Sequence, residues 1–403
     1  MKAYPLIATL IVASSGCGSA APTKKPPGVT DHAQMNDLSV MFPLARSQAE
    51  WESYLTPGSQ GATGTLLPYS LYSAVDTNAV AYADLRLVSF RLDPCFAQIG
   101  PIDSSACEPQ LRLIFQTLAF EDGAATANDD AVHAFYRLDG GQFEAALGEI
   151  IGIREANGGT AALGPLAPHP IMAQQGLDGP MATQLRATVL KYAGSATLVR
   201  FTLFRSAGLN APAPAGASGE ARFWNFHGFD VAADTATPIA IPSLPDGAVS
   251  ANLPSTATEP LYASFQPETV AADDIQVLAN YGLALAASAA DRQGGYDAAL
   301  RIENPNVHSP NTIDCVSCHM SQPARQLTAE KYFGLSAVGN ANAFATDPGI
   351  PATDVVPTTA VLDGDRLNLH AFSYRGTAAM INQRVINETA AILAYVRGAK
   401  AAE

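Results

Sequence analysis

Five strand-like runs are the feature that most constrains the fold of this chain. Each is rich in leucine, β-branched or aromatic residues, and they occupy residues 85–92, 111–118, 132–138, 198–204 and 222–226. Two helical patterns separate the third run from the fourth, because apolar residues recur three or four places apart around 143–151 and 181–192. The sequence shows no repeat of 20 to 50 residues, which argues against a propeller or solenoid. These runs predict an α+β region with an antiparallel sheet and a few helices.

The length of 403 residues leaves room for two or three domains. We expect a leader over 1–17, a Pro- and Lys-containing tether over 18–37, an α+β domain of unknown role over 38–270, and a mainly α-helical domain over 271–403. The chain has 23 basic and 37 acidic residues, a formal charge of −14. That balance argues against nucleic acid as a partner.

The N-terminal leader has the pattern of an export signal. Lys2 precedes an apolar run over 5–13 that is too short to span a bilayer, and Ser-Ser-Gly-Cys17 follows. This arrangement resembles a bacterial lipoprotein processing site, which implies that Cys17 is lipidated; an ordinary secretory signal is the alternative. We expect an exported protein, held by its lipid alone on the periplasmic side or at the outer membrane of a Gram-negative bacterium.

Cys95 and Cys107 bracket the segment between the first two strand-like runs. In an exported protein such a pair predicts a disulfide that closes a hairpin-like loop. A redox-active pair is the alternative, but it usually requires a tight C-x-x-C at the start of a helix.

Cys315-Val-Ser-Cys-His319 carries the clearest chemical motif in the chain. C-x-x-C-H is the attachment pattern of c-type haem, in which Cys315 and Cys318 bond the vinyl groups covalently and His319 ligates the iron. Two alternatives stay open. One is a zinc site of Cys315, Cys318, His319 and His308, although a second ligand pair is missing. The other is a simple disulfide or dithiol.

From this motif onward, residues 300–403 resemble the class I c-type cytochromes. An amphipathic pattern over 385–396 looks like their closing helix, with Tyr395 at its aromatic position. The resemblance implies a single covalent haem c. A large exported region followed by one motif is also similar to uncharacterised haem-binding lipoproteins of Gram-negative bacteria.

The resemblance also suggests the sixth iron ligand. Met380 lies 61 residues after His319, close to the family's distal methionine; His370 and His308 are the alternatives. In one respect the chain departs from the family, because Pro305 and Pro310 prevent a continuous helix from leading into the motif. We expect that helix earlier, around 274–289. The remaining dispersed histidines are interpreted as structural or surface residues: His133, His169 and His227.

The sequence therefore predicts a mono-haem c-type cytochrome that transfers single electrons to redox partner proteins of unknown identity. It predicts an electron carrier more readily than an enzyme. A haem peroxidase or a protein that binds a small ligand at iron is one alternative. The other is a surface binding module in which the haem has a structural role.

Overall fold

A computed structural model describes most of the chain, and everything below concerns the residues that it describes. They are residues 32–75, 82–96, 108–207, 222–232, 234–239, 248–253, 273–279, 281–310, 312–357, 362–363, 366–367 and 369–398. The predicted leader, Cys17 and Cys107 lie outside them.

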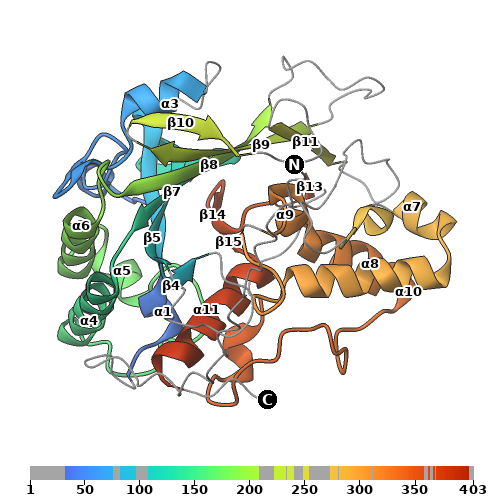
Figure 1. Cartoon of the computed structure of the whole chain (residues 1–403). Coiled ribbons are helices and arrows are strands. Elements are labelled where there is room, and N and C mark those ends of the chain that lie inside the picture. Colours follow the sequence, from blue (N-terminus) through green and yellow to red (C-terminus); the bar gives the residue numbers. More distant parts are fainter. Residues whose placement is uncertain are drawn as a thin grey trace, which may run out of the picture.

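An antiparallel sheet forms the centre of the described structure (Figure 1). Its main path runs β1-β4-β5-β7-β8-β9-β10, with β6 beside β5 and β11 beside β9. The strands are β1 Ser39–Met41, β4 Leu85–Phe96, β5 Glu108–Glu121, β6 Ala124–Ala127, β7 Asp130–Arg137, β8 Leu198–Ala207, β9 Arg222–Ala232, β10 Thr235–Pro238 and β11 Ala248–Leu253. All five predicted strands are therefore present, as β4, β5, β7, β8 and β9, and the mixed α+β class is confirmed.

Two predicted helices cover one side of this sheet, α4 (Gly140–Ala156) and α6 (Pro180–Tyr192) (Figure 1). A capping box starts α4: Asp139 accepts a hydrogen bond from the Gln142 amide, and Gln142 accepts one from the Asp139 amide. Pro180 opens α6 at a position where its missing N–H costs nothing. The apolar stripe of each helix is buried, as its spacing predicts.

The C-terminal part of the chain covers the other side of the sheet (Figure 1). Its helices include α7 (Tyr281–Ala286), α8 (Ala289–Ile302), α9 (Cys315–Pro323) and α11 (Gln383–Val396). This part also contains four short strands: β12 Leu362–Asp363, β13 Arg366–Leu367, β14 Phe372–Arg375 and β15 Ala378–Ile381. A mainly helical C-terminal domain is accordingly not shown.

The region before the motif departs from the expected helix over 274–289. A 3-10 turn over Gln276–Leu278 and the short α7 fill that range, and the longer α8 begins at Ala289. Ser288 caps α8 by accepting a hydrogen bond from the Asp291 amide. As the prolines require, no helix runs directly into Cys315: α8 ends at Ile302.

Buried hydrogen bonds join the sheet to the C-terminal elements. The Ser89 hydroxyl donates to the Phe372 carbonyl oxygen at 2.7 Å, and the hydroxyls of Ser39 and Thr389 lie 2.7 Å apart. The Gln116 side chain accepts from the Tyr374 amide and donates to the Tyr374 carbonyl oxygen. A single hydrophobic cluster includes residues of both parts. In the described residues, no helix is long and apolar enough to cross a membrane.

Candidate functional site

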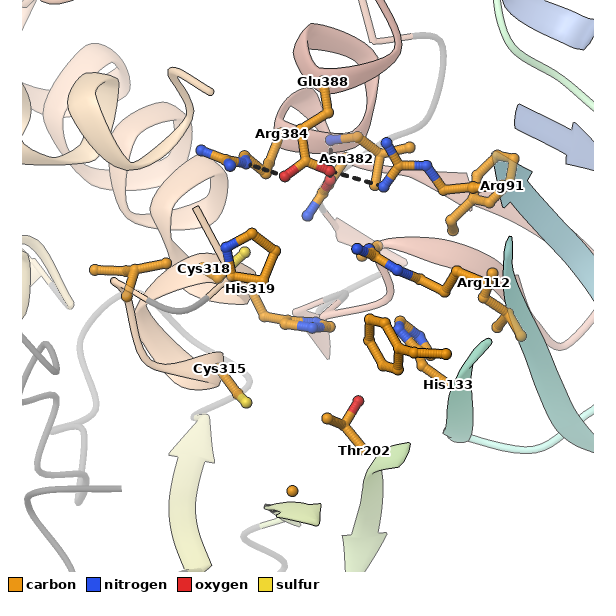
Figure 2. A pocket seen from close by; sticks show the side chains of 18 of the residues that line it. Arg91, Arg112, His133, Thr202, Cys315, Cys318, His319, Asn382, Arg384 and Glu388 are labelled. Carbon is orange, nitrogen blue, oxygen red and sulfur yellow. Dashed lines mark hydrogen bonds and ion pairs between the residues drawn. The ribbon is translucent and has the colours of Figure 1, made fainter. Parts of the chain in front are cut away.

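A cavity of about 290 Å³ lies between α9 and the sheet, and side chains of the C-x-x-C-H motif line it (Figure 2). This volume lies just below the ~300–1,000 Å³ usual for small-molecule sites. The lining residues that matter below are those of the motif, those of the sheet and those of α11. They are Cys315, Cys318 and His319; Arg91, Arg112, Ile114, His133, Phe135, Arg200, Thr202 and Gly228; and Asn382, Arg384 and Glu388.

The helical wall of the cavity places the motif side chains together. Asp314 is the N-cap of α9 and accepts a hydrogen bond from the Ser317 amide at 2.9 Å, so the helix starts at Cys315. Residues three and four places apart share one face of a helix. Cys315, Cys318 and His319 have this spacing, and all three are half-buried side chains that line the cavity.

A backbone carbonyl holds the imidazole of His319. The Nδ1 atom of His319 lies 2.5 Å from the carbonyl oxygen of Leu369, which can only accept a hydrogen bond, so Nδ1 is the protonated nitrogen. The Nε2 atom then carries the lone pair that a metal ion requires. Burial lowers the pKa of His319 to about 4, which keeps the ring neutral at pH 7. Phe204 and Phe226 pack against this ring, with centroid separations of 5.3 and 5.1 Å.

Both cysteines of the motif carry thiols and are not joined in a disulfide. Burial raises the pKa of Cys318 to about 11, so this thiol is protonated at neutral pH. A protonated, weakly nucleophilic thiol is unsuited to spontaneous disulfide exchange. These two thiols and the imidazole are the donor set that the motif predicts.

The sheet wall consists of two rows of residues that run across the strands. Cross-strand partners Arg91, Arg112, Phe135 and Arg200 form the first row, on β4, β5, β7 and β8. Ile114, His133, Thr202 and Gly228 form the second row, on β5, β7, β8 and β9. The rows are two residues apart along each shared strand, so they point to the same face. All eight residues line the cavity.

The first row concentrates positive charge in a protein of net charge −14. Arg91 and Arg112 are direct cross-strand partners, an arrangement of like charges that is unfavourable by itself. Burial, followed by the charge of Arg91, lowers the pKa of Arg112 to about 10, so Arg112 is still charged at pH 7. The Arg112 guanidinium also packs over the Phe135 ring, 4.6 Å from its centroid.

Glu388 joins α11 to the sheet wall electrostatically (Figure 2). One carboxylate oxygen lies 2.8 Å from Arg91 Nη1 on the sheet, and the other lies 2.6 Å from Arg384 Nε on α11. Burial alone would raise the pKa of Glu388, but Arg384, Arg91 and Arg112 together hold it well below its usual range. The carboxylate is therefore ionised and neutralises part of the arginine charge.

The three predicted sixth ligands are not among the residues that line this cavity. Met380 is buried on β15, opposite Ser373 of β14. Nε2 of His370 lies 2.8 Å from Asp129 and its Nδ1 lies 2.6 Å from the Ser373 hydroxyl. His308 likewise has both ring nitrogens within hydrogen-bond distance, of Asp273 at 2.8 Å and of Thr312 at 3.2 Å. The assignment of Met380 as the sixth ligand stays a prediction from sequence.

The remaining predicted sites lie elsewhere. Cys95 is buried and disulfide-bonded, while Cys107, its predicted partner, is outside the described residues. Cys17 is also outside them. In the part of the chain that the structure describes, no three His, Cys, Asp or Glu side chains form a group that could hold a metal ion.

Sequence reasoning missed the sheet wall. Arg91, Arg112, His133 and Arg200 all lie within predicted strands, yet none was expected at the site. One signal could have found them, because charged and histidine side chains inside otherwise apolar strands need a polar partner if both faces of the sheet are covered.

Comparison with protein-family models, with curated proteins and with solved structures found no match for this chain.

Proposed function

We propose that this protein is an exported mono-haem c-type cytochrome whose haem is bound covalently in the cavity between α9 and the sheet. One observation carries the proposal. Cys315, Cys318 and His319 line the same cavity from one helix face. Because Nδ1 of His319 donates to a carbonyl oxygen, its Nε2 atom is the one available to bind a metal ion. A C-x-x-C-H pattern occurring by chance would have no reason to meet a cavity or to hold its histidine in this tautomer.

The chemistry of the cavity suits the group that the motif implies. The two thiols would each add across a vinyl double bond, with the sulfur on one carbon and the thiol hydrogen on the other. His319 would supply one axial nitrogen to iron. Haem also carries two carboxylates, and arginine is the side chain best adapted to bind them. Arg112 supplies such a charge beside apolar Ile114 and Phe135. Arg91 and Arg200 also line the cavity and are ion-paired with Glu388 and Asp230.

The resemblance to class I cytochromes is part of the proposal. The predicted closing helix is present as α11, and Asn382 caps it by accepting a hydrogen bond from the Val385 amide. The Gln322 side chain, on α9, accepts a hydrogen bond from the Gln383 amide of α11 at 2.7 Å. In this proposal the sheet covers the haem in place of a helix leading into Cys315.

The protein would act as a single-electron carrier, with iron cycling between the ferric and ferrous states when haem is bound. The chain's own groups would fix the axial imidazole, exclude water and set the local charge. We further propose that the leader directs export, that Cys17 carries the lipid anchor, and that the partners are redox proteins of unknown identity.

The first experiment is expression in a bacterial host that attaches c-type haem to exported proteins. Haem staining of a denaturing gel and the absorption spectrum of the denatured pyridine complex would report covalent attachment. The matched control is the Cys315→Ser/Cys318→Ser double variant. Attachment in the natural sequence and its loss in the control are expected.

Redox titration of the purified holoprotein then distinguishes electron transfer from ligand binding and peroxidase chemistry. A reversible one-electron transition with low-spin iron in both states supports electron transfer. High-spin ferric iron that binds cyanide or reacts with peroxide would replace this proposal by ligand binding or peroxidase chemistry. A folded protein from this host without covalent haem would overturn the cytochrome assignment, and metal analysis of Cys315 and Cys318 would follow.

A further inference from the structure

His133 is the one histidine on the sheet wall of the cavity. It lies on β7 between its cross-strand partners Ile114 and Thr202, and all three line the cavity. Its side chain is half-buried, whereas the adjacent Val132 and Ala134 on the opposite face are fully buried. Its ring nitrogens form no hydrogen bond or ion pair with any residue that the structure describes.

The other histidines near the site have hydrogen-bond partners within the protein. His308 and His370 engage both ring nitrogens, so neither has a lone pair left for iron. His319 engages only Nδ1. His133 is half-buried and lines the cavity that carries the C-x-x-C-H motif, so its ring nitrogens are available to a ligand bound there. His133 and His319 are thus the two histidines that face the cavity with nitrogen available.

These two side chains approach the cavity from opposite walls (Figure 2). His319 projects from α9, and His133 projects from the sheet beside Arg112. Burial, reinforced by the charges of Arg112, His319 and Arg91, holds the pKa of His133 well below its usual range. Its ring is therefore neutral, the form that coordinates metals.

We propose that His133 is the second axial ligand of the haem iron, on the face opposite His319. This inference rests on the covalent haem of the proposed function and names the residue that completes its coordination. Two axial imidazoles leave no open position, which suits electron transfer better than peroxide or oxygen chemistry. They also give a lower reduction potential than one imidazole with a methionine thioether.

The test is electron paramagnetic resonance and optical spectroscopy of the ferric holoprotein, with covalent haem verified in every sample. The natural sequence should show low-spin bis-imidazole signals and lack the weak red absorption band of methionine-bound ferric haem. His133→Ala should become high-spin, and added imidazole should restore the low-spin state. His133→Met should stay low-spin, gain the red band and have a higher reduction potential. The matched control Met380→Leu should leave the spectra unchanged.

Two results would overturn the inference while leaving the cytochrome assignment in place. One is a natural protein with covalent haem that is high-spin or carries the red band. The other is a low-spin His133→Ala variant that does not change on adding imidazole. If His133→Ala fails to fold, His133→Met still decides, because only ligation by residue 133 would replace the bis-imidazole signals with the red band. Absence of covalent haem from the natural protein would overturn both proposals.

Discussion

The two walls of the cavity differ in how their residues are brought together. The helical wall takes its two thiols and its imidazole from five consecutive residues on one turn of α9. The residues of the sheet wall lie on β4, β5, β7, β8 and β9. They are up to 137 positions apart in the sequence, from Arg91 to Gly228. Chemistry held in one helical turn is visible in a sequence. Chemistry held in a cross-strand row becomes visible only when the register is known.

The walls also differ in what holds them in place. Two hydrogen bonds organise the helical wall: the local Asp314 cap, and the bond from His319 to the carbonyl oxygen of Leu369, 50 residues along the chain. The ladder of the sheet organises the other, and Glu388 connects α11 to the sheet through Arg91. Each wall can therefore be perturbed separately, and the connection can be perturbed as a third case.

The largest expected effect comes from removing the thiols of the helical wall. Cys315→Ser/Cys318→Ser should abolish covalent haem completely, because a serine hydroxyl does not add to a vinyl group under these conditions. Haem staining after denaturation measures this. Arg112→Gln, on the sheet wall, should retain full attachment. Covalent haem in the double serine variant would show that the helical wall is not the attachment site.

Breaking the connection between α11 and the sheet wall should cost the most stability. Glu388→Gln leaves Arg91 and Arg384 buried without their counter-charge, and removal of one partner from a buried ion pair costs about 3–5 kcal/mol. Urea unfolding of the variant and the natural protein at pH 7 measures the loss. Glu108→Gln is the matched control, because its partner Arg137 and Glu108 itself are both more than half exposed, and such pairs contribute about 0–1 kcal/mol.

The same variant gives a pH prediction. The pKa of Glu388 is depressed in the folded state, so between that value and its ordinary value the unfolded chain binds more protons. The contribution of Glu388 to the free energy of unfolding is therefore complete at neutral pH and is lost as the pH falls below about 4.5. The stability difference between Glu388→Gln and the natural protein should shrink in acid. A difference that stays constant from pH 7 to pH 3 would contradict the role of Glu388 as an ionised connection.

A smaller effect is expected when a single charge is removed from the sheet wall. Arg112 is cationic at pH 7 and lines the cavity, so it should disfavour the ferric state of a bound haem more than the ferrous state. Arg112→Gln should lower the reduction potential while covalent attachment stays complete. Potentiometric titration measures the shift, and Arg137→Gln at the surface is the control. Equal potentials in all three proteins would place the haem away from this row.

The smallest effect concerns the start of the motif helix. Asp314→Ala removes the N-cap bond to the Ser317 amide and should cost about 1 kcal/mol. Asp139→Ala removes the equivalent cap of α4 and should cost a similar amount. Only Asp314→Ala should also reduce the yield of covalent haem, since fraying moves Cys315 relative to His319. Equal yields in both variants would mean that the cap has no part in presenting the motif.

The elements that sequence patterns predict well are those with long periodic apolar stripes. β4, β5, β7, β8 and β9 were all expected, as were α4, α6 and α11. The short strands β14 and β15 were missed because four-residue segments carry little pattern and depend on contacts such as the Gln116 bonds to Tyr374. The helix before the motif was expected too early, because its capping residue, Ser288, was not recognised.

For the site, the sequence predicted the helical wall and not the sheet wall. Cys315, Cys318 and His319 share a cavity as the motif implies. The cross-strand register decides that Arg91, Arg112 and His133 face this cavity, and register depends on turns and bulges such as the irregularity between Leu87 and Ser89. A shift of one residue would turn all three away. For the same reason His133 was interpreted as a structural or surface histidine.

The hydrogen-bonded pair Ser39–Thr389 has a consequence for the order in which the protein assembles. The two residues are 350 positions apart, and Arg91 and Glu388 are separated by 297. Contacts between such distant segments form slowly, because the chain loses the entropy of a long loop before the contact stabilises the fold. The C-terminal helix therefore closes over the sheet only after nearly the whole chain has been synthesised. Cys315 and Cys318 are half-buried in the folded chain, so in the proposed function their attachment to haem would precede this step.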